Sequence, residues 1–329
     1  MSSPRTTETP TRSRLRGAEL IDPESLMRIK SLHARARAVV EGFLSGIHRS
    51  PFHGFSAEFS EYREYSPGDD LRYLDWRLYA RSDRYYVKRF EDETNLRCYL
   101  LVDVSRSMGY GSGNVSKDHY ARTAAATLAY FLNQQRDAVG LFTFAQEVLH
   151  AVPPRYRPGH LQRLIAALEI ELQGHGTDLG QPLEQIAASS RKRGMVVLFS
   201  DMLAEIDKLE KQLGFLTSQG HEVVLMRILD PAEVEFDLEK PAMFHDMETG
   251  RDMYIDPAAA REEYQQRFSE HQQQVEQTCR KLGIDFFQFT TARPMEMVLF
   301  DYLSWRMQRG TSTSGRVRRR GNFRAGGAR

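Results

Sequence analysis

Five mostly apolar runs, separated by segments of helical length, constrain this 329-residue chain more than any other feature of its sequence. The runs cover residues 96–102, 138–144, 195–199, 222–228 and 284–289. Helical patterns cover residues 118–135, 161–172, 183–190, 206–217, 257–282 and 295–307. Apolar strands that alternate with helices are typical of a parallel sheet with both faces covered. The sequence therefore predicts a doubly wound, mostly parallel α/β fold over residues 95–308.

The segment before this region, residues 22–94, predicts a smaller accessory part. Apolar residues recur at helical spacing from Pro23 to His48, which predicts one amphipathic helix. Two short strands are expected near residues 59–65 and 85–90, with an irregular excursion over residues 67–83 between them. We expect the helix and the excursion to pack on the sheet as an accessory layer, because their aromatic residues need a surface to cover.

Three further segments depart from the alternation of strands and helices. A turn signal inside a polar and aromatic stretch predicts a small hairpin near residues 233–256, inserted at the sheet edge. Residues 1–21 and 309–329 are expected to be disordered tails, since their compositions bury too little apolar surface to offset ordering entropy. The second tail is rich in arginine and could make weak contacts with nucleic acid.

Composition limits the class of protein. The formal net charge is +1, so the body lacks the large field of one sign that a dedicated polyanion-binding protein needs. Cys98 and Cys279 lie far apart, which argues against a disulfide framework or a zinc site and favours a reducing compartment. The first residues lack the apolar core of a signal peptide, and no apolar run reaches about 18 residues. We therefore expect a cytoplasmic protein without a membrane span.

Oxygen-bearing side chains follow the predicted strands at the points where the strands end. Asp103, Ser105 and Ser107 follow the first strand, Thr177 lies in a glycine-rich loop, and Asp201 follows the third strand. Loops at the carboxyl ends of such strands converge where the strand order changes. An acid at a buried strand end is costly unless it is paired, hydrogen-bonded or coordinated. Two carboxylates and three hydroxyls predict a site for a hard cation, with Mg²⁺ expected and Mn²⁺ or Ca²⁺ as alternatives.

A different interpretation of the same residues is structural. Aspartate and serine are good helix N-caps, so these side chains could serve to cap helices at the ends of the strands. An enzyme is a further alternative, because a bound cation can activate water for hydrolysis. Ser105 and Ser107 lack the G-x-S-x-G elbow, however, and no P-loop motif is present. We therefore expect a protein that is not an enzyme and has no small-molecule substrate, with a metal-dependent hydrolase as the alternative.

The five residues resemble the metal-ion-dependent adhesion site of von Willebrand factor A domains. The Asp-x-Ser-x-Ser element at residues 103–107 is followed by a Gly-Thr-Asp loop about 70 residues later and a strand-terminal aspartate about 24 residues further on. The resemblance implies that Asp103, Ser105 and Ser107 supply the first loop, Thr177 the second and Asp201 the third. It also implies that a carboxylate from a protein partner completes the coordination sphere. The role of Arg106, a cation at the rim, is not fixed by the motif.

Two other stretches resemble a bacterial family catalogued as domain of unknown function fifty-eight. They are residues 58–93, which begin "EFSEYREYSPGDD", and residues 243–264, which begin "MFHDMETGRDMY". The resemblance covers about residues 22–308 and leaves the two tails. Members of that family are usually associated with MoxR-type AAA+ ATPases, and are thought to be metal-dependent adaptors or co-chaperones without established catalytic activity. The resemblance therefore implies a MoxR-type ATPase as the protein partner.

Overall fold

The computed structural model describes residues 20–48, 62–64, 86–88, 96–170, 180–189, 193–204, 206–236, 241–245 and 252–317. At its centre is a six-stranded sheet in the order β10-β7-β6-β3-β4-β5. The strands are β3 (Arg97–Asp103), β4 (Ala138–Phe144), β5 (Val148–Arg155), β6 (Met195–Ser200), β7 (Glu222–Leu229) and β10 (Asp285–Thr290). Every neighbouring pair is parallel except β4 and β5, which are antiparallel. The predicted mostly parallel α/β sheet is confirmed.

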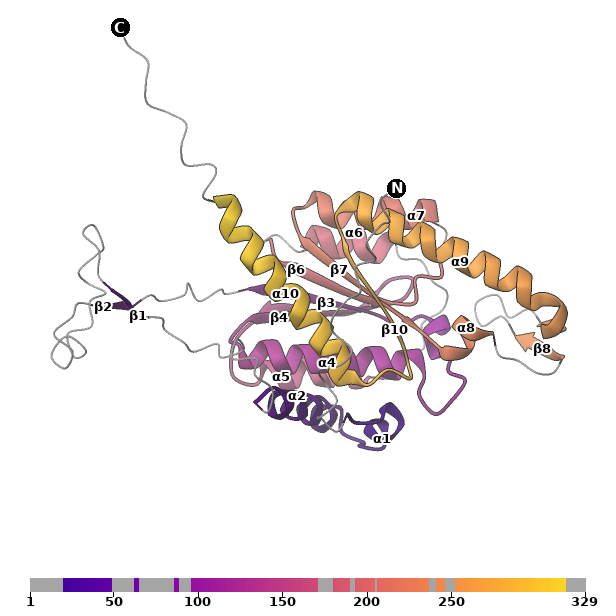
Figure 1. The fold of residues 1–329 in the computed structure, drawn as a ribbon, viewed down its shortest axis with the longest axis horizontal. Helices are drawn as coiled ribbons and strands as arrows, with labels where there is room; N and C mark the ends of the chain where they lie inside the picture. The colour runs from indigo at the N-terminus through magenta and orange to yellow at the C-terminus, as the bar shows by residue number, and fades with distance from the viewer. Residues whose placement is uncertain are drawn as a thin grey trace, which may run out of the picture.

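Helices cover both faces of the sheet (Figure 1). Their apolar sides form two separate cores. Along β3, Leu100 and Val102 point into one core, and Tyr99 and Leu101 point into the other, as the pleat requires. The first core includes residues of α4 (Lys117–Gln134), α5 (His160–Glu169) and α10 (Met295–Val317). The second includes residues of α6 (Gly180–Ser189), α7 (Ile206–Ser218) and α9 (Pro257–Leu282). This arrangement leaves the strand ends open to the loops.

The predicted N-terminal helix is two helices, so the expectation of a single one was wrong. The helices are α1 (Pro23–Met27) and α2 (Leu32–His48). Asp22 caps the first by accepting a hydrogen bond from the Ser25 backbone N–H at 3.0 Å. Ser31 starts the second, because its hydroxyl accepts from the Ala34 N–H at 3.3 Å. Both helices contribute buried side chains to the core around α4, and the expected excursion over residues 67–83 lies outside the described residues.

Two small antiparallel pairs accompany the central sheet. Strands β1 (Tyr62–Glu64) and β2 (Tyr86–Lys88) pair with each other, as expected. Strands β8 (Ala242–His245) and β9 (Asp252–Ile255) form the predicted hairpin. This hairpin is a separate two-stranded sheet and does not extend the edge of the six-stranded one. Its turn falls outside the described residues.

Strand β5 and the end of α10 differ from the prediction. Strand β5 was not predicted, because Pro153 and Pro154 lack the backbone N–H that an interior strand donates. The structure places it at the sheet edge, where this loss is tolerated. Helix α10 continues to Val317, ten residues past the predicted end at Met307. Glycines at 310 and 315 disfavour a helix by about 1 kcal/mol each, but an existing helix can propagate through them.

No helix in the described ranges is long and apolar enough to cross a membrane. Both cysteines, Cys98 and Cys279, are buried and reduced. Burial in the two cores raises the pKa of each thiol, which keeps both protonated. The cysteines therefore act as small apolar core residues.

Arg122 ties helix α4 to the end of α5. Its Nη1 atom donates to the carbonyl oxygens of Leu168 and Ile170, each at 2.6 Å, and its Nε atom donates to Asp118 at 2.7 Å. The last carbonyls of a helix lack partners within the helix, so a buried guanidinium supplies the missing donors.

Replacing Arg122 with methionine is expected to lower the free energy of unfolding by about 2–4 kcal/mol, because one buried and one partly buried carbonyl would lose their donor. The matched control is Arg37→Met, which removes an exposed pair with Glu41 and is expected to cost less than about 0.5 kcal/mol. Urea denaturation of both variants measures the difference. Similar losses in the two would contradict the role given to Arg122.

Candidate metal centre

The candidate site lies where the strand order of the central sheet reverses. The chain leaves β3, adds β4 and β5 on one side, and then places β6 on the other side of β3. Asp103 is the last residue of β3, and Asp201 directly follows β6. The register pairs Val102 with Phe199, so the two strands end at the same level. At such a switch point the loops that follow neighbouring strands diverge and leave a crevice. Ligands of open α/β sheets bind in this crevice.

Asp103 is fully buried and makes two hydrogen bonds that orient its carboxylate. One oxygen accepts from the Ser105 backbone N–H at 2.9 Å, and the other accepts from the Ser200 hydroxyl at 2.6 Å. Ser105 is also buried, and its Oγ lies 3.1 Å from the Oγ of Ser107. Ser107 lies in the short 3₁₀-helix η2 (Arg106–Gly109). The Asp-x-Ser-x-Ser segment thus gathers one carboxylate and two hydroxyls at the end of one strand.

Burial, and after it the nearby Asp201 carboxylate, raise the pKa of Asp103 to about 6. Hydrogen bonds from Ser200 and Ser105 oppose this rise by stabilising the charged form. The site therefore carries an electrostatic cost that a nearby positive charge would relieve.

Lys117 supplies one such charge to the second acid. Asp201 is fully buried, and its Oδ2 accepts from the Lys117 ammonium at 2.9 Å. The same ammonium donates to Oε1 of Glu233 at 2.5 Å. Burial lowers the pKa of Lys117, but Asp201 and Glu233 together outweigh burial and leave it raised. The second oxygen of Asp201 accepts from the Leu203 backbone N–H at 3.2 Å.

Glu233 is held in place by the start of helix α8 (Pro231–Glu235), which follows β7. Its second oxygen accepts from the Asp230 backbone N–H at 2.8 Å, and the Asp230 side chain accepts from the Ala232 N–H at 2.9 Å, which completes a capping box. Asp230 also accepts from the Ser112 N–H at 2.9 Å and so fastens the loop that leads into α4. The segments after β3 and β7 are therefore joined beside the acids.

A buried arginine fixes the backbone of the Asp201 loop. Arg227 on β7 is fully buried and donates from Nε to the Asp201 carbonyl at 2.9 Å. Its Nη2 lies 3.3 Å from Nδ1 of His271, whose Nε2 lies 3.3 Å from the Ala204 carbonyl. Within this loop Met202 has a φ of 55°, a left-handed conformation that costs a non-glycine residue about 1–2 kcal/mol. These hydrogen bonds hold the strained turn that follows Asp201.

The described donors have the chemistry of a hard-cation site. Carboxylate oxygens of Asp103 and Asp201 and hydroxyl oxygens of Ser105 and Ser107 are the ligand types that Mg²⁺ and Ca²⁺ take. No group of three histidine, cysteine, aspartate or glutamate side chains that could hold a metal occurs in the described parts of the chain. The fit of a hard cation to the described residues therefore depends on the hydroxyls of Ser105 and Ser107 as well as on the two carboxylates. Thr177, the remaining predicted ligand, lies outside the described residues.

The two acids make turn contacts in place of the helix caps that the structural interpretation expected. Asp103 and Asp201 each accept a hydrogen bond from the backbone N–H two residues later, as aspartates do in turns. These turn contacts orient the carboxylates and leave further lone pairs on their oxygens for other partners. Arg106 is exposed at the rim of the site.

Sequence analysis missed three of the residues around the acids. They are Lys117, Arg227 and Glu233. Two carried a detectable signal: Arg227 interrupts the apolar run "VVLMRIL", and Glu233 completes the capping pattern Asp-Pro-Ala-Glu. Lys117 at the start of a helix is indistinguishable in sequence from a solvated lysine.

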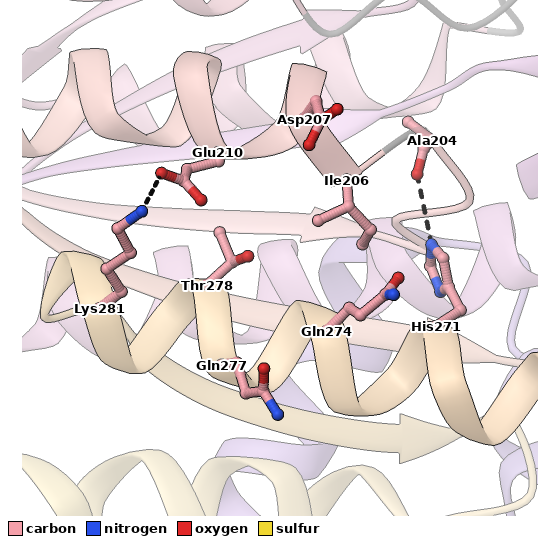
Figure 2. Close-up of a pocket in the computed structure, with 9 residues that line it drawn as sticks. All are labelled: Ala204, Ile206, Asp207, Glu210, His271, Gln274, Gln277, Thr278 and Lys281. Atoms are coloured by element: carbon pink, nitrogen blue, oxygen red, sulfur yellow. Dashed lines mark hydrogen bonds and ion pairs between the residues drawn. The ribbon is translucent and has the colours of Figure 1, made fainter.

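A polar groove of about 730 Å³ lies between α7 and α9 on one face of the sheet (Figure 2). Nine residues line it: Ala204, Ile206, Asp207, Glu210, His271, Gln274, Gln277, Thr278 and Lys281. Glu210 and Lys281 pair across it at 2.5 Å, and His271 is bound to the Ala204 carbonyl. No serine or cysteine is among these residues. The groove therefore offers hydrogen-bonding and charged groups of both signs.

Comparison with known proteins identifies relatives that align with most of this chain. The protein-family model described as "Protein of unknown function DUF58" matches residues 61–274. The chain is 29% identical over 286 residues to "Uncharacterized protein Rv1480" of Mycobacterium tuberculosis and to "Uncharacterized protein Mb1516" of Mycobacterium bovis. Each alignment covers 85% of this chain and 89% of the relative.

Solved structures with some likeness to the fold include the conserved hypothetical protein BatB from Bacteroides thetaiotaomicron. It has a TM-score of 0.43 and 12% identity, and the match covers 65% of this chain and 99% of BatB. The SpRpn10 VWA domain has a TM-score of 0.37 and 12% identity, and the match covers 62% of this chain and 93% of that domain. Likenesses this distant do not bear on the candidate site.

The raised pKa of Asp103 predicts a stability that falls as pH rises. Between about pH 4 and pH 6 the folded state keeps a proton that the unfolded state has released, so without a divalent cation folding weakens across this window. Relative to Asp103→Asn, which does not titrate, the unmodified protein is expected to lose about 1–3 kcal/mol between pH 4 and pH 7.5. Urea denaturation at both pH values measures it; a constant difference between the two proteins would contradict the prediction.

Proposed function

Because this chain belongs to the DUF58 family of proteins of unknown function, we propose that it is a metal-dependent adaptor that binds a carboxylate of a protein partner. The observation that carries the proposal is the meeting of Asp103, Ser105 and Asp201 at the ends of two adjacent strands. Buried acids and hydroxyls at a switch point are suited to a hard divalent cation, of which Mg²⁺ is the expected one.

In this proposal each of three loops would contribute ligands to the cation. Asp103, Ser105 and Ser107 would hold the cation from the loop after β3, Thr177 from the second loop, and Asp201 from the loop after β6. A bound Mg²⁺ supplies Lewis acidity, which attracts a further oxygen ligand. Three of these five donors are neutral hydroxyls, and the Asp201 carboxylate is already paired with Lys117, so the five donors leave part of the charge of the cation uncancelled. The site would therefore favour an anionic ligand from outside, such as an aspartate or glutamate side chain.

We further propose that the protein is not an enzyme. Hydrolysis at this cation would need a general base within hydrogen-bond reach of a bound water. Among the described residues around the acids, Glu233 is the remaining carboxylate in contact with Lys117, and both of its oxygens already accept hydrogen bonds. This supports a binding role over the alternative of a metal-dependent hydrolase.

The proposed partner is a MoxR-type AAA+ ATPase, for which this chain would serve as an adaptor or co-chaperone. Support for this partner comes from the family resemblance of residues 58–93 and 243–264. The absence of a P-loop motif in the sequence agrees with a division of labour in which the partner hydrolyses ATP.

Binding of a MoxR-type AAA+ ATPase from the same organism is expected to require both magnesium and the acids. In calorimetric titrations the affinity should be measurable with Mg²⁺, and should fall by about tenfold or more with chelator, in Asp103→Asn and in Ser105→Ala. Asp103→Asn keeps the size of the side chain, and Glu41→Gln, an exposed charge on α2, is the matched control that should bind normally. Equal affinity under all of these conditions would refute the metal-bridged mechanism.

A further inference from the structure

Lys117 occupies an unfavourable position for a lysine. It is the first residue of α4, and its side chain is fully buried. The amino end of a helix carries partial positive charge, which repels a cation placed there. Burial of an ammonium group adds a further cost unless it is paired. A lysine held at such a place must be stabilised by its partners.

Those partners are the acids of the candidate site. The ammonium contacts Asp201 at 2.9 Å and Glu233 at 2.5 Å, and it lies 5.8 Å from the centre of the Tyr110 ring. Neither carboxylate belongs to the same helix: Asp201 follows β6, and Glu233 lies in α8. Lys117 therefore links three separate segments through charge.

Apart from the exposed Arg106 at the rim, the charges around the site balance with one divalent cation. Four carboxylates, those of Asp103, Asp201, Asp230 and Glu233, surround two buried cations, Lys117 and Arg227. This leaves two negative charges, which one Mg²⁺ would neutralise. Arg227 touches Asp201 through the backbone carbonyl, whereas Lys117 touches the carboxylate itself. Lys117 is therefore the positive charge that competes directly with a metal ion for Asp201.

We propose that Lys117 is a built-in counter-ion that sets the affinity of the site for its divalent cation, and this inference rests on the proposed function. In the absence of metal, Lys117 stabilises the buried acid pair and keeps the Asp201 loop in place. In the presence of metal, its charge repels the cation and weakens binding. Glu233 draws the ammonium away from Asp201, so it has the opposite effect and strengthens metal binding.

A purely structural role for Lys117 predicts a different outcome. If the ammonium only fastened the Asp201 loop, its removal would loosen that loop and would leave the affinity for metal unchanged or lower. The counter-ion role predicts a higher affinity, because the site gains one net negative charge. The direction of the change in affinity therefore separates the two roles.

The experiment compares Lys117→Gln and Glu233→Gln with the unmodified full-length chain, by calorimetric titration with MgCl₂. Lys117→Gln is expected to bind Mg²⁺ about tenfold or more tightly than the unmodified protein. Glu233→Gln keeps the capping pattern but removes one negative charge, and is expected to bind Mg²⁺ more weakly. Thermal unfolding gives a second readout: without metal Lys117→Gln should melt at a lower temperature, and Mg²⁺ should raise its melting temperature by more than that of the unmodified protein.

The matched control is Arg306→Gln, which removes a partly buried ion pair with Asp137 at 3.5 Å. Asp137 immediately precedes β4, at the amino end of a strand, whereas the acids of the site follow the carboxyl ends. This variant is expected to be less stable and to bind Mg²⁺ as the unmodified protein does.

Each outcome is decisive. Equal or weaker Mg²⁺ binding by Lys117→Gln overturns the counter-ion role while leaving the metal site intact. Absence of Mg²⁺ binding by both the unmodified protein and Lys117→Gln overturns the metal site itself, and the inference with it. If Lys117→Gln does not fold, Glu233→Gln decides, since unchanged or tighter binding by that variant overturns the role given to Lys117.

Discussion

The burial of two carboxylates at the ends of neighbouring strands is the constraint on which the rest of this site depends. Desolvation of each charge costs several kcal/mol, so neither acid could remain ionised here without compensation. Asp103 receives a hydroxyl and a backbone N–H, whereas Asp201 receives an ammonium. Among the described residues no cation contacts Asp103, and burial raises its pKa.

Compensation of these acids also organises the loops around them. Lys117 begins α4, Glu233 lies in α8 and Arg227 lies within β7, so the segments after three strands meet at the acids. Because removal of one member would leave a buried charge without its partner, the contacts form one interdependent network. The strained turn at Met202 is kept by the same contacts, since it costs energy and has no glycine to relieve it.

The sequence carried strong local signals for the strands and helices of the fold. It carried only weak ones for the network of contacts around the two buried acids. Strand β4 and helix α9 were predicted to the residue, because one is an uninterrupted apolar run and the other has Asp-Pro at its start and glycine at its end. The positions of Asp103 and Asp201 at adjacent strand ends followed from the alternation of strands and helices. The contact between Lys117 and Asp201 joins residues 84 positions apart, and a charge placed by packing leaves no local pattern. Thr177 stays a prediction.

The prolines of β5 have a consequence for how copies of this protein meet. An outermost strand normally presents a row of free N–H groups that can recruit a strand from a neighbouring molecule. At positions 153 and 154 that row is interrupted, because proline has no N–H to offer. The interruption prevents strands of other molecules from adding to this edge of the sheet and growing into fibres. Other molecules are therefore expected to bind elsewhere than at this edge.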